Sequence, residues 1–80
     1  MTPEEMTLVI EGRRAASTGR GVRIREAAGI SQTELAALVG VTQAAVWRWE
    51  ARSRVPTTRC AMAYARALRQ LAESVVSAHG

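Results

Sequence analysis

Four residues near the middle of the chain have side chains and a spacing suited to reading the edges of DNA bases. They are Gln43, Ala44, Trp47 and Arg48, which fall at positions i, i+1, i+4 and i+5 of a helix and so share one face. A glutamine amide can pair with adenine and an arginine guanidinium with guanine, each through two hydrogen bonds, and Ala44 can approach a thymine methyl group. We therefore predict that this face reads bases in the major groove.

Trp47 and Arg48 each have a second interpretation. A tryptophan offers a large apolar surface that is unusual on an exposed helix face, so Trp47 either contacts a base or packs against the N-terminal helix or a second subunit. Arg48 is either a base reader or a plain solvated charge. The sequence leaves both alternatives open.

The segment 32–51 predicts two short helices that would position this face. Ala36 is small where a second helix would cross steeply, and Gly40 falls just after the first helix, where a sharply reversing chain enters the left-handed region. An i, i+4 pair on the first helix, one residue in the turn and an i, i+3 pair on the second predict a buried seam. The seam consists of Leu35, Val39, Val41, Val46 and Trp49.

Both of these helices have recognisable starts. Ser31 followed by Glu34 three residues later is the pattern of a capping box. Thr42 stands where the N-cap of the second helix belongs. We therefore expect a helix-turn-helix, a motif whose second helix enters the major groove while the first crosses the DNA backbone.

A longer stretch, from Gly21 to Pro56, carries a resemblance to a known family. Its carriers are Val22, Arg23, Ile24, Arg25, Glu26, Gly29, Ile30, Ser31, Gln32, Glu34, Leu35, Ala36, Gly40, Val41, Thr42, Val46, Trp49, Glu50, Arg54 and Pro56. In this register the stretch resembles the lambda-repressor-like family, the Cro/C1 or XRE type of helix-turn-helix. The resemblance implies a compact bundle of four or five helices that binds operator DNA as a phage or prophage regulator, usually as a dimer on a near-palindromic site.

Some roles carry over from this resemblance by position. Gln32 resembles the family glutamine that bonds a DNA phosphate and supports the reading residue after the turn, which here is Gln43. Glu50 is expected to cap or pair within the fold rather than to read bases. The family commonly has a glycine after this glutamate, whereas this chain has Ala51 and Arg52. We therefore expect the exit from the second helix to run longer or to take a different shape.

Polar residues around the motif are candidates for contacts with DNA phosphates. Arg52 and Arg54 follow the second helix and are expected to lie near the backbone. Thr57 begins the next helix, whose free amide groups can hold a phosphate, although simple helix capping is the alternative. Together with Gln32 and Thr42, these residues complete the predicted phosphate contacts.

The charge balance favours a polyanionic partner. The net charge is +4, from 11 arginines and 7 glutamates, with neither lysine nor aspartate in the chain. Binding to phosphates releases condensed counterions, so a basic protein of this kind should bind DNA in a salt-dependent manner. The absence of lysine equally fits a genome rich in G and C, so this bias alone does not establish a function.

The 80 residues are expected to form one all-α domain, because no run of β-branched residues alternates with polar ones. Within 1–80 we expect, in order, a leading helix at 2–14, the family core at 20–56 and a C-terminal helix at 57–78. No apolar stretch approaches the roughly 20 residues of a membrane span, and Glu4 and Glu5 stand where a secretory signal would be basic. We therefore expect a cytoplasmic protein, in a bacterial host cell or its nucleoid.

The last helix has an apolar stripe that is longer than one small domain should cover. We expect its distal part to contact a second subunit in a homodimer, through Leu68, Leu71, Val75 and Val76. The alternative is that residues after Leu71 fray or fold back as a short helix. The leading helix either covers the core, mediates dimerisation or caps an exposed edge.

An enzymatic role is not expected. One histidine, one cysteine and no aspartate are too few to build a nucleophile, a base and an orienting acid, and we expect no metal, cofactor or small-molecule ligand. The leading hypothesis is a Cro-like repressor. The alternatives are an antitoxin or a phage recombination-control protein with the same module, and a protein-interaction module that has lost DNA binding.

Overall fold

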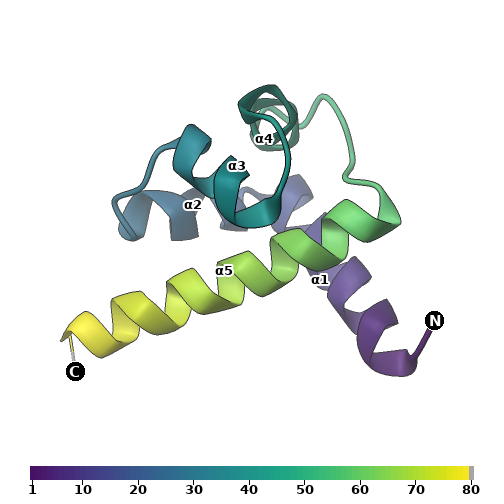
Figure 1. Ribbon diagram of the computed structural model, residues 1–80, viewed down its shortest axis with the longest axis horizontal. Coiled ribbons are helices and arrows are strands. Elements are labelled where there is room, and N and C mark those ends of the chain that lie inside the picture. The colour runs from purple at the N-terminus through teal and green to yellow at the C-terminus, as the bar shows by residue number, and fades with distance from the viewer. Residues whose placement is uncertain (80) are drawn as a thin grey trace.

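Residues 1–79 are described by the computed structural model, and most of them lie in five helices. The helices are α1 (Pro3–Thr18), α2 (Arg20–Ala27), α3 (Gln32–Val39), α4 (Gln43–Glu50) and α5 (Thr58–His79). Figure 1 shows α5 running along the molecule, with α2, α3 and α4 on one side of it and the N-terminal part of α1 on the other. Since residues 1–79 contain no strand, the predicted all-α bundle with a helix-turn-helix, a leading helix and a long last helix is confirmed.

Helix α1 begins where the sequence predicts but runs further. Thr2 caps it through a capping box, which fixes the start. The predicted range of 2–14 ends too early, because Ala15 and Ala16 continue the helix and are buried in the core. The connection to α2 is reduced to Gly19, whose φ of 79° lies in the left-handed region that favours glycine.

The leading helix covers the core by crossing α5, the helix with which it makes its most extensive contacts. A Cβ atom at Gly12 would collide with the backbone carbonyl of Ala61, so only glycine allows this close approach. Gly21, at the start of α2, leaves the space that the Tyr64 hydroxyl group occupies. Of the three roles left open for the leading helix, the structure therefore shows that it covers the core.

The core joins the helix-turn-helix to α5. Leu35 of α3 and Val46 of α4 are fully buried against Tyr64 of α5. The rings of Trp49 and Tyr64 have centroids 5.0 Å apart and planes tilted by 44°, which is a favourable arrangement for an aromatic pair. The seam predicted from the sequence is thus the surface by which the motif is held in the bundle.

Helix α5 is continuous to His79, so the alternative in which the chain folds back after Leu71 is not observed in residues 1–79. Leu68 and Leu71 are only 2% and 8% exposed. The prediction that Leu68 and Leu71 contact a second subunit is wrong, because both side chains are enclosed by the core of the chain itself. Val75 is half-buried, and Val76, at 71% exposure, is the apolar residue of the predicted stripe that remains open to a partner.

No helix formed by residues 1–79 is both long enough and apolar enough to cross a membrane.

Candidate nucleic-acid interface

The turn between α3 and α4 is built by local hydrogen bonds. Gly40 ends α3 with a φ of 85°, and its amide donates to the carbonyl of Ala36 at 2.8 Å. The amide of Val41 donates to the same carbonyl at 3.0 Å, which reverses the chain within two residues. Thr42 then begins α4, because its Oγ1 accepts from the amide of Ala45 at 3.1 Å. The predicted cap and turn residues therefore set the angle of α4.

The start of α3 is fixed in the same way. Ser31 Oγ accepts from the amide of Glu34 at 3.0 Å, and the Glu34 carboxylate accepts from the amide of Ser31 at 2.8 Å. The Glu34 carboxylate is hydrogen-bonded to the backbone amide of Ser31 and lies close to its side chain. Because both groups of Ser31 favour the charged carboxylate, the pKa of Glu34 lies below its ordinary value. The predicted capping box is therefore complete.

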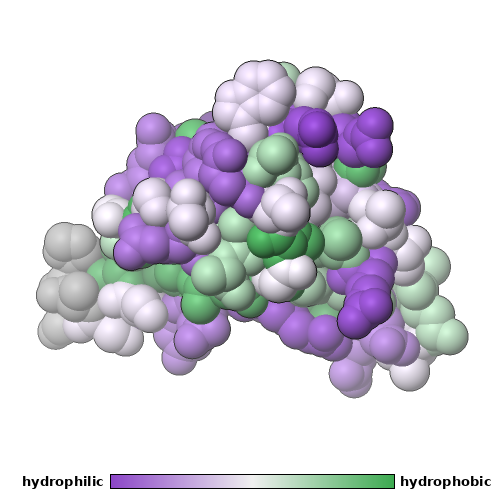
Figure 2. Space-filling view, turned by 45° about the horizontal axis from the view of Figure 1, so that its top comes forward, coloured by the Kyte–Doolittle hydropathy of each residue, from purple (hydrophilic) through white to green (hydrophobic). Residues whose placement is uncertain are grey.

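Helix α4 has one buried face and one exposed face. Val46 and Trp49 point into the core, whereas Gln43, Ala44 and Arg48 are exposed. Trp47 is 54% exposed, so it does not pack into the core as Trp49 does. Figure 2, in which the α4 side of Figure 1 is turned forward, shows near-white side chains flanked by purple, hydrophilic ones along this upper surface, and green, apolar ones closer to the middle. All four predicted base-reading residues therefore lie together on the open face of α4.

A chain of hydrogen bonds connects this open face to the interior. Gln43 Nε2 donates to Gln32 Oε1 at 2.7 Å, and Gln32 Nε2 donates to Glu50 Oε1 at 2.9 Å. Arg25 completes the chain, since its Nε and Nη2 donate to the two oxygens of Glu50 at 2.6 and 2.9 Å. We call these four residues, Arg25, Glu50, Gln32 and Gln43, the polar relay. It joins α2, α3 and both ends of α4.

The polar relay fixes which way the glutamine amides face. Glu50 can only accept, so Gln32 must point its NH2 group inward and its oxygen toward Gln43. Gln43 therefore uses one N–H within the fold and keeps its second N–H and its Oε1 for another partner. One donor beside one acceptor is the pair of groups that adenine requires in the major groove.

The inner end of the polar relay is a nearly buried ion pair. The side chains of Arg25 and Glu50 are 14% and 6% exposed. The hydrogen bonds to Glu50 raise the pKa of Arg25 above its ordinary value, because they favour the charged guanidinium. Arg25 Nη1 also donates to the carbonyl of Ile30 at 2.9 Å, which holds the loop before α3.

Sequence reasoning expected Glu50 to pair within the fold but did not identify Arg25 as its partner. Twenty-five positions separate the two residues, and no local pattern links them. The one feature of the sequence that could have indicated this partner is that Arg25 belongs to a helix that also has to bury an apolar face.

The exit from α4 differs from the family pattern in the way the sequence indicated. Ala51 remains right-handed with a φ of −77°, and Arg52 takes the left-handed conformation with a φ of 60°. The amides of Arg52 and Ser53 close the end of the helix by donating to the carbonyls of Trp49 and Arg48, at 3.1 and 2.9 Å. The left-handed position thus comes one residue later than the expected glycine, and an arginine occupies it.

The predicted phosphate contacts fall into three groups. Gln32 is half-buried in the polar relay, while Arg52 and Arg54 are exposed in the loop after α4. Thr42 and Thr57 are exposed and act as caps, since Thr57 Oγ1 accepts from the amide of Cys60 at 3.4 Å. A hydroxyl group that accepts in this way can still donate its own hydrogen, so capping and phosphate binding are compatible.

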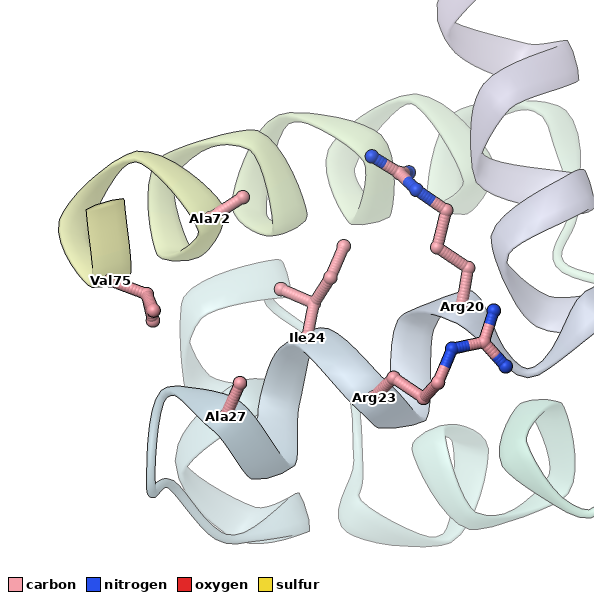
Figure 3. Close-up of a pocket in the computed structure, with 6 residues that line it drawn as sticks. All are labelled: Arg20, Arg23, Ile24, Ala27, Ala72 and Val75. Carbon is pink, nitrogen blue, oxygen red and sulfur yellow. The ribbon is translucent and has the colours of Figure 1, made fainter.

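A separate hollow of about 250 Å³ lies between α2 and α5. Figure 3 shows Ile24 and Ala27 of α2 across from Ala72 and Val75 of α5, with Arg20 and Arg23 farther along α2. Val75, one of the predicted dimer contacts, therefore lies at the edge of a surface that is largely apolar.

The fold and the open face of α4 define a helix-turn-helix DNA-binding domain. A model of the helix-turn-helix family matches residues 23–73, more than half of the chain, and the chain belongs to this family, in its lambda-repressor-like Cro/C1 or XRE type. The protein is accordingly a DNA-binding regulator of the XRE type. No curated protein and no solved structure matches the chain. Helix α1 lies outside the matched residues, whereas α3 and α4 lie within them.

Proposed function

We propose that this protein is a Cro-like repressor of the phage or prophage type, which recognises an operator in double-stranded DNA by placing α4 in the major groove. In this proposal it acts by binding alone, without catalysis and without a cofactor. The observation that carries the proposal is the hydrogen bond from Gln43 to Gln32, which holds an exposed amide in a defined orientation beside Arg48.

Two exposed side chains of α4 provide the direct readout. Gln43, near the N-terminus of α4, presents its free N–H and Oε1 to an adenine. Arg48 lies five residues later on the same face and can donate two hydrogen bonds to a guanine. An operator half-site with adenine and guanine a few base pairs apart is therefore expected.

The exposed arginines provide affinity that does not depend on sequence. Arg52 and Arg54 follow α4 directly, so they approach the backbone when α4 lies in the groove. Each phosphate that they neutralise releases a counterion, which makes binding weaker as salt increases.

The experiment is a selection of bound sites from a random DNA pool, followed by affinity measurements on the selected site and on random DNA. Replacing Gln43 or Arg48 by alanine should weaken binding to the selected site by about 1–3 kcal/mol and binding to random DNA much less. Arg66→Ala is the charge-matched control, because Arg66 is an exposed arginine of α5 outside the reading face. Unchanged sequence preference in both α4 variants would refute the proposed reading face, and no affinity for any duplex would favour an interaction module instead.

The protein is also proposed to act as a homodimer through the distal part of α5. Val76 is exposed, and Val75 borders the hollow between α2 and α5, so a second copy could bury both. A two-fold dimer that reads successive major grooves places its half-sites about one helical turn, roughly 34 Å, apart.

The dimer is tested by sedimentation of Val76→Glu beside Ser77→Glu. The two changes add the same charge at neighbouring exposed positions, but only the first removes an apolar contact. We expect a dimer for the Ser77 variant and a monomer for the Val76 variant. Equal masses for the two variants would contradict this interface.

A further inference from the structure

A small hollow lies beside the exit from α4, at the end of this helix opposite to Gln43. It has a volume of about 60 Å³ and is lined by α1, the end of α4 and the loop that follows. The lining residues are Arg13, Ala16, Ser17, Trp49, Arg52, Arg54 and Val55. Three of these seven residues are arginines.

These arginines have no carboxylate partner within the described chain. Across residues 1–79 the ion pairs are Arg25 with Glu50 and Arg69 with Glu11. Arg13, Arg52 and Arg54 therefore bring three positive charges around one hollow without a counter-charge from the fold. Like charges held close together disfavour the folded state unless an anion joins them.

The position of Arg13 is fixed by the backbone. Its Nε donates to the carbonyl of Pro56 at 3.2 Å, and its Nη2 donates to Thr58 Oγ1 at 3.4 Å. A guanidinium carries five N–H groups, so these two bonds leave others available. Arg13 thus ties α1 to the start of α5 while its charge stays at the hollow.

The position of Arg52 is strained. Its φ of 60° is a conformation that residues other than glycine rarely adopt, and such strain concentrates at functional positions. Its guanidinium reaches back to the junction of α1 and α2, where a Cβ atom at Gly19 would lie 3.0 Å from Nη2. Because Gly19 has no side chain, there is room for the guanidinium of Arg52 at this position.

We propose that this hollow binds a phosphate oxyanion, and that in the complex the oxyanion is a backbone phosphate of the bound DNA. The inference rests on the proposed function, because Arg52 and Arg54 follow α4 directly and are carried to the backbone only if α4 enters the groove. A volume of 60 Å³ is about that of two water molecules, which suits one oxyanion group rather than a larger organic ligand. Arginine is the side chain best suited to such a group.

The consequence concerns α1. This helix lies outside the residues that match the helix-turn-helix family, yet it supplies Arg13 and Ser17 to the hollow. It therefore adds a phosphate clamp to the usual motif, at the end of the reading helix opposite to Gln43.

The test places a carboxylate in the hollow without removing any arginine. Ser17→Glu does this, and Ser74→Glu is the matched control, because both serines are exposed in helices and both donate to a carbonyl of the preceding turn. On random duplex DNA at low salt, Ser17→Glu should bind about tenfold more weakly than Ser74→Glu, as expected for a lost bond to a charged group. The slope of the logarithm of its DNA affinity against the logarithm of the salt concentration should also become shallower, by the amount expected for one lost phosphate contact.

A second arm measures the oxyanion alone. Inorganic phosphate, added at constant ionic strength against chloride, should raise the melting temperature of the wild type and of Ser74→Glu but not of Ser17→Glu. Equal responses of all three proteins in both arms would overturn the proposal. A phosphate response with equal DNA affinities of the two variants would overturn the backbone as its source. If the wild type binds no DNA at all, the proposed function fails, while the phosphate response still decides whether the hollow binds an oxyanion.

Discussion

The two faces of α4 show how eight residues divide two tasks. On the inner face, Trp49 is 3% exposed and packs on Tyr64, whereas Trp47, two positions earlier, is 54% exposed on the outer face. Packing of the inner face fixes the position of α4 in the bundle. The side chains of the outer face are not needed for this packing. Gln43 is the exception, because the polar relay joins this outer residue to buried Glu50.

The largest expected effect comes from exchanging the two tryptophans for alanine. Trp49→Ala leaves a cavity beside Tyr64 and should lower the free energy of unfolding by about 3–5 kcal/mol. Trp47→Ala should change it by less than about 0.5 kcal/mol, because surface substitutions rarely do more. Urea unfolding measures both. Similar losses of unfolding free energy in the two variants would mean that Trp47 packs on another part of the protein, and would contradict the assignment of an inner and an outer face.

A smaller effect is expected from breaking the inner end of the polar relay. Glu50→Gln keeps the shape of the side chain but leaves Arg25 without its counter-charge, and it should lower the free energy of unfolding by about 1.5–3 kcal/mol. Discrimination between operator and random DNA should also fall, because an amide offers one accepting oxygen to Arg25 and Gln32 where the carboxylate offers two.

The exposed pair of Arg69 and Glu11 supplies the control for that change. Their Nε and Oε2 atoms are 2.8 Å apart, but the side chains are 56% and 28% exposed. Glu11→Gln should therefore cost at most about 1 kcal/mol and leave DNA discrimination unchanged. Equal losses at Glu11 and Glu50 would show that burial adds nothing to the relay.

The inner face also predicts a response to alkaline pH. Burial raises the pKa of Tyr64 from 10.0 to about 12, nearby Glu50 adds to this, and its hydroxyl group has no hydrogen-bond partner in residues 1–79. Because the folded state resists ionisation, this contribution to stability is complete below pH 10 and is lost as the pH rises toward 12. The slope cannot exceed about 1.4 kcal/mol per pH unit for one proton.

Tyrosinate absorbance and urea unfolding across this pH range test the response. Tyr64 is the single tyrosine of the chain, so the absorbance reports on it alone. Tyr64→Phe should remove this part of the alkaline slope. A folded protein whose tyrosine ionises near pH 10 would contradict the burial of this ring.

The faces of α4 were predictable from the sequence because the signals that form them are local. Ser31, Gly40 and Thr42 form cap and turn hydrogen bonds with residues three or four positions away. The buried pair of Val46 and Trp49 follows from the helical period. The outer face follows once the inner one is known.

The remaining features depend on contacts between distant parts of the chain. Arg13 reaches Pro56 across 43 positions, and no periodicity indicates such a bond. Leu68 was expected at a dimer interface because the apolar stripe of the last helix looked too long for one domain. The sequence could not show how much of that stripe α1, α2 and α3 would cover.

The smallest expected effect is at Thr42, which lies where the two faces of α4 begin. Thr42→Ala removes the N-cap bond to Ala45 and should lower the free energy of unfolding by about 1 kcal/mol, whereas Thr42→Ser keeps the hydroxyl group and should lose little. If the hydroxyl also donates to a DNA phosphate, Thr42→Ala should weaken binding to operator and random DNA equally, in measurements made where both variants are fully folded. Loss of stability with unchanged DNA affinity would assign Thr42 to capping alone. The outer face would then begin at Gln43.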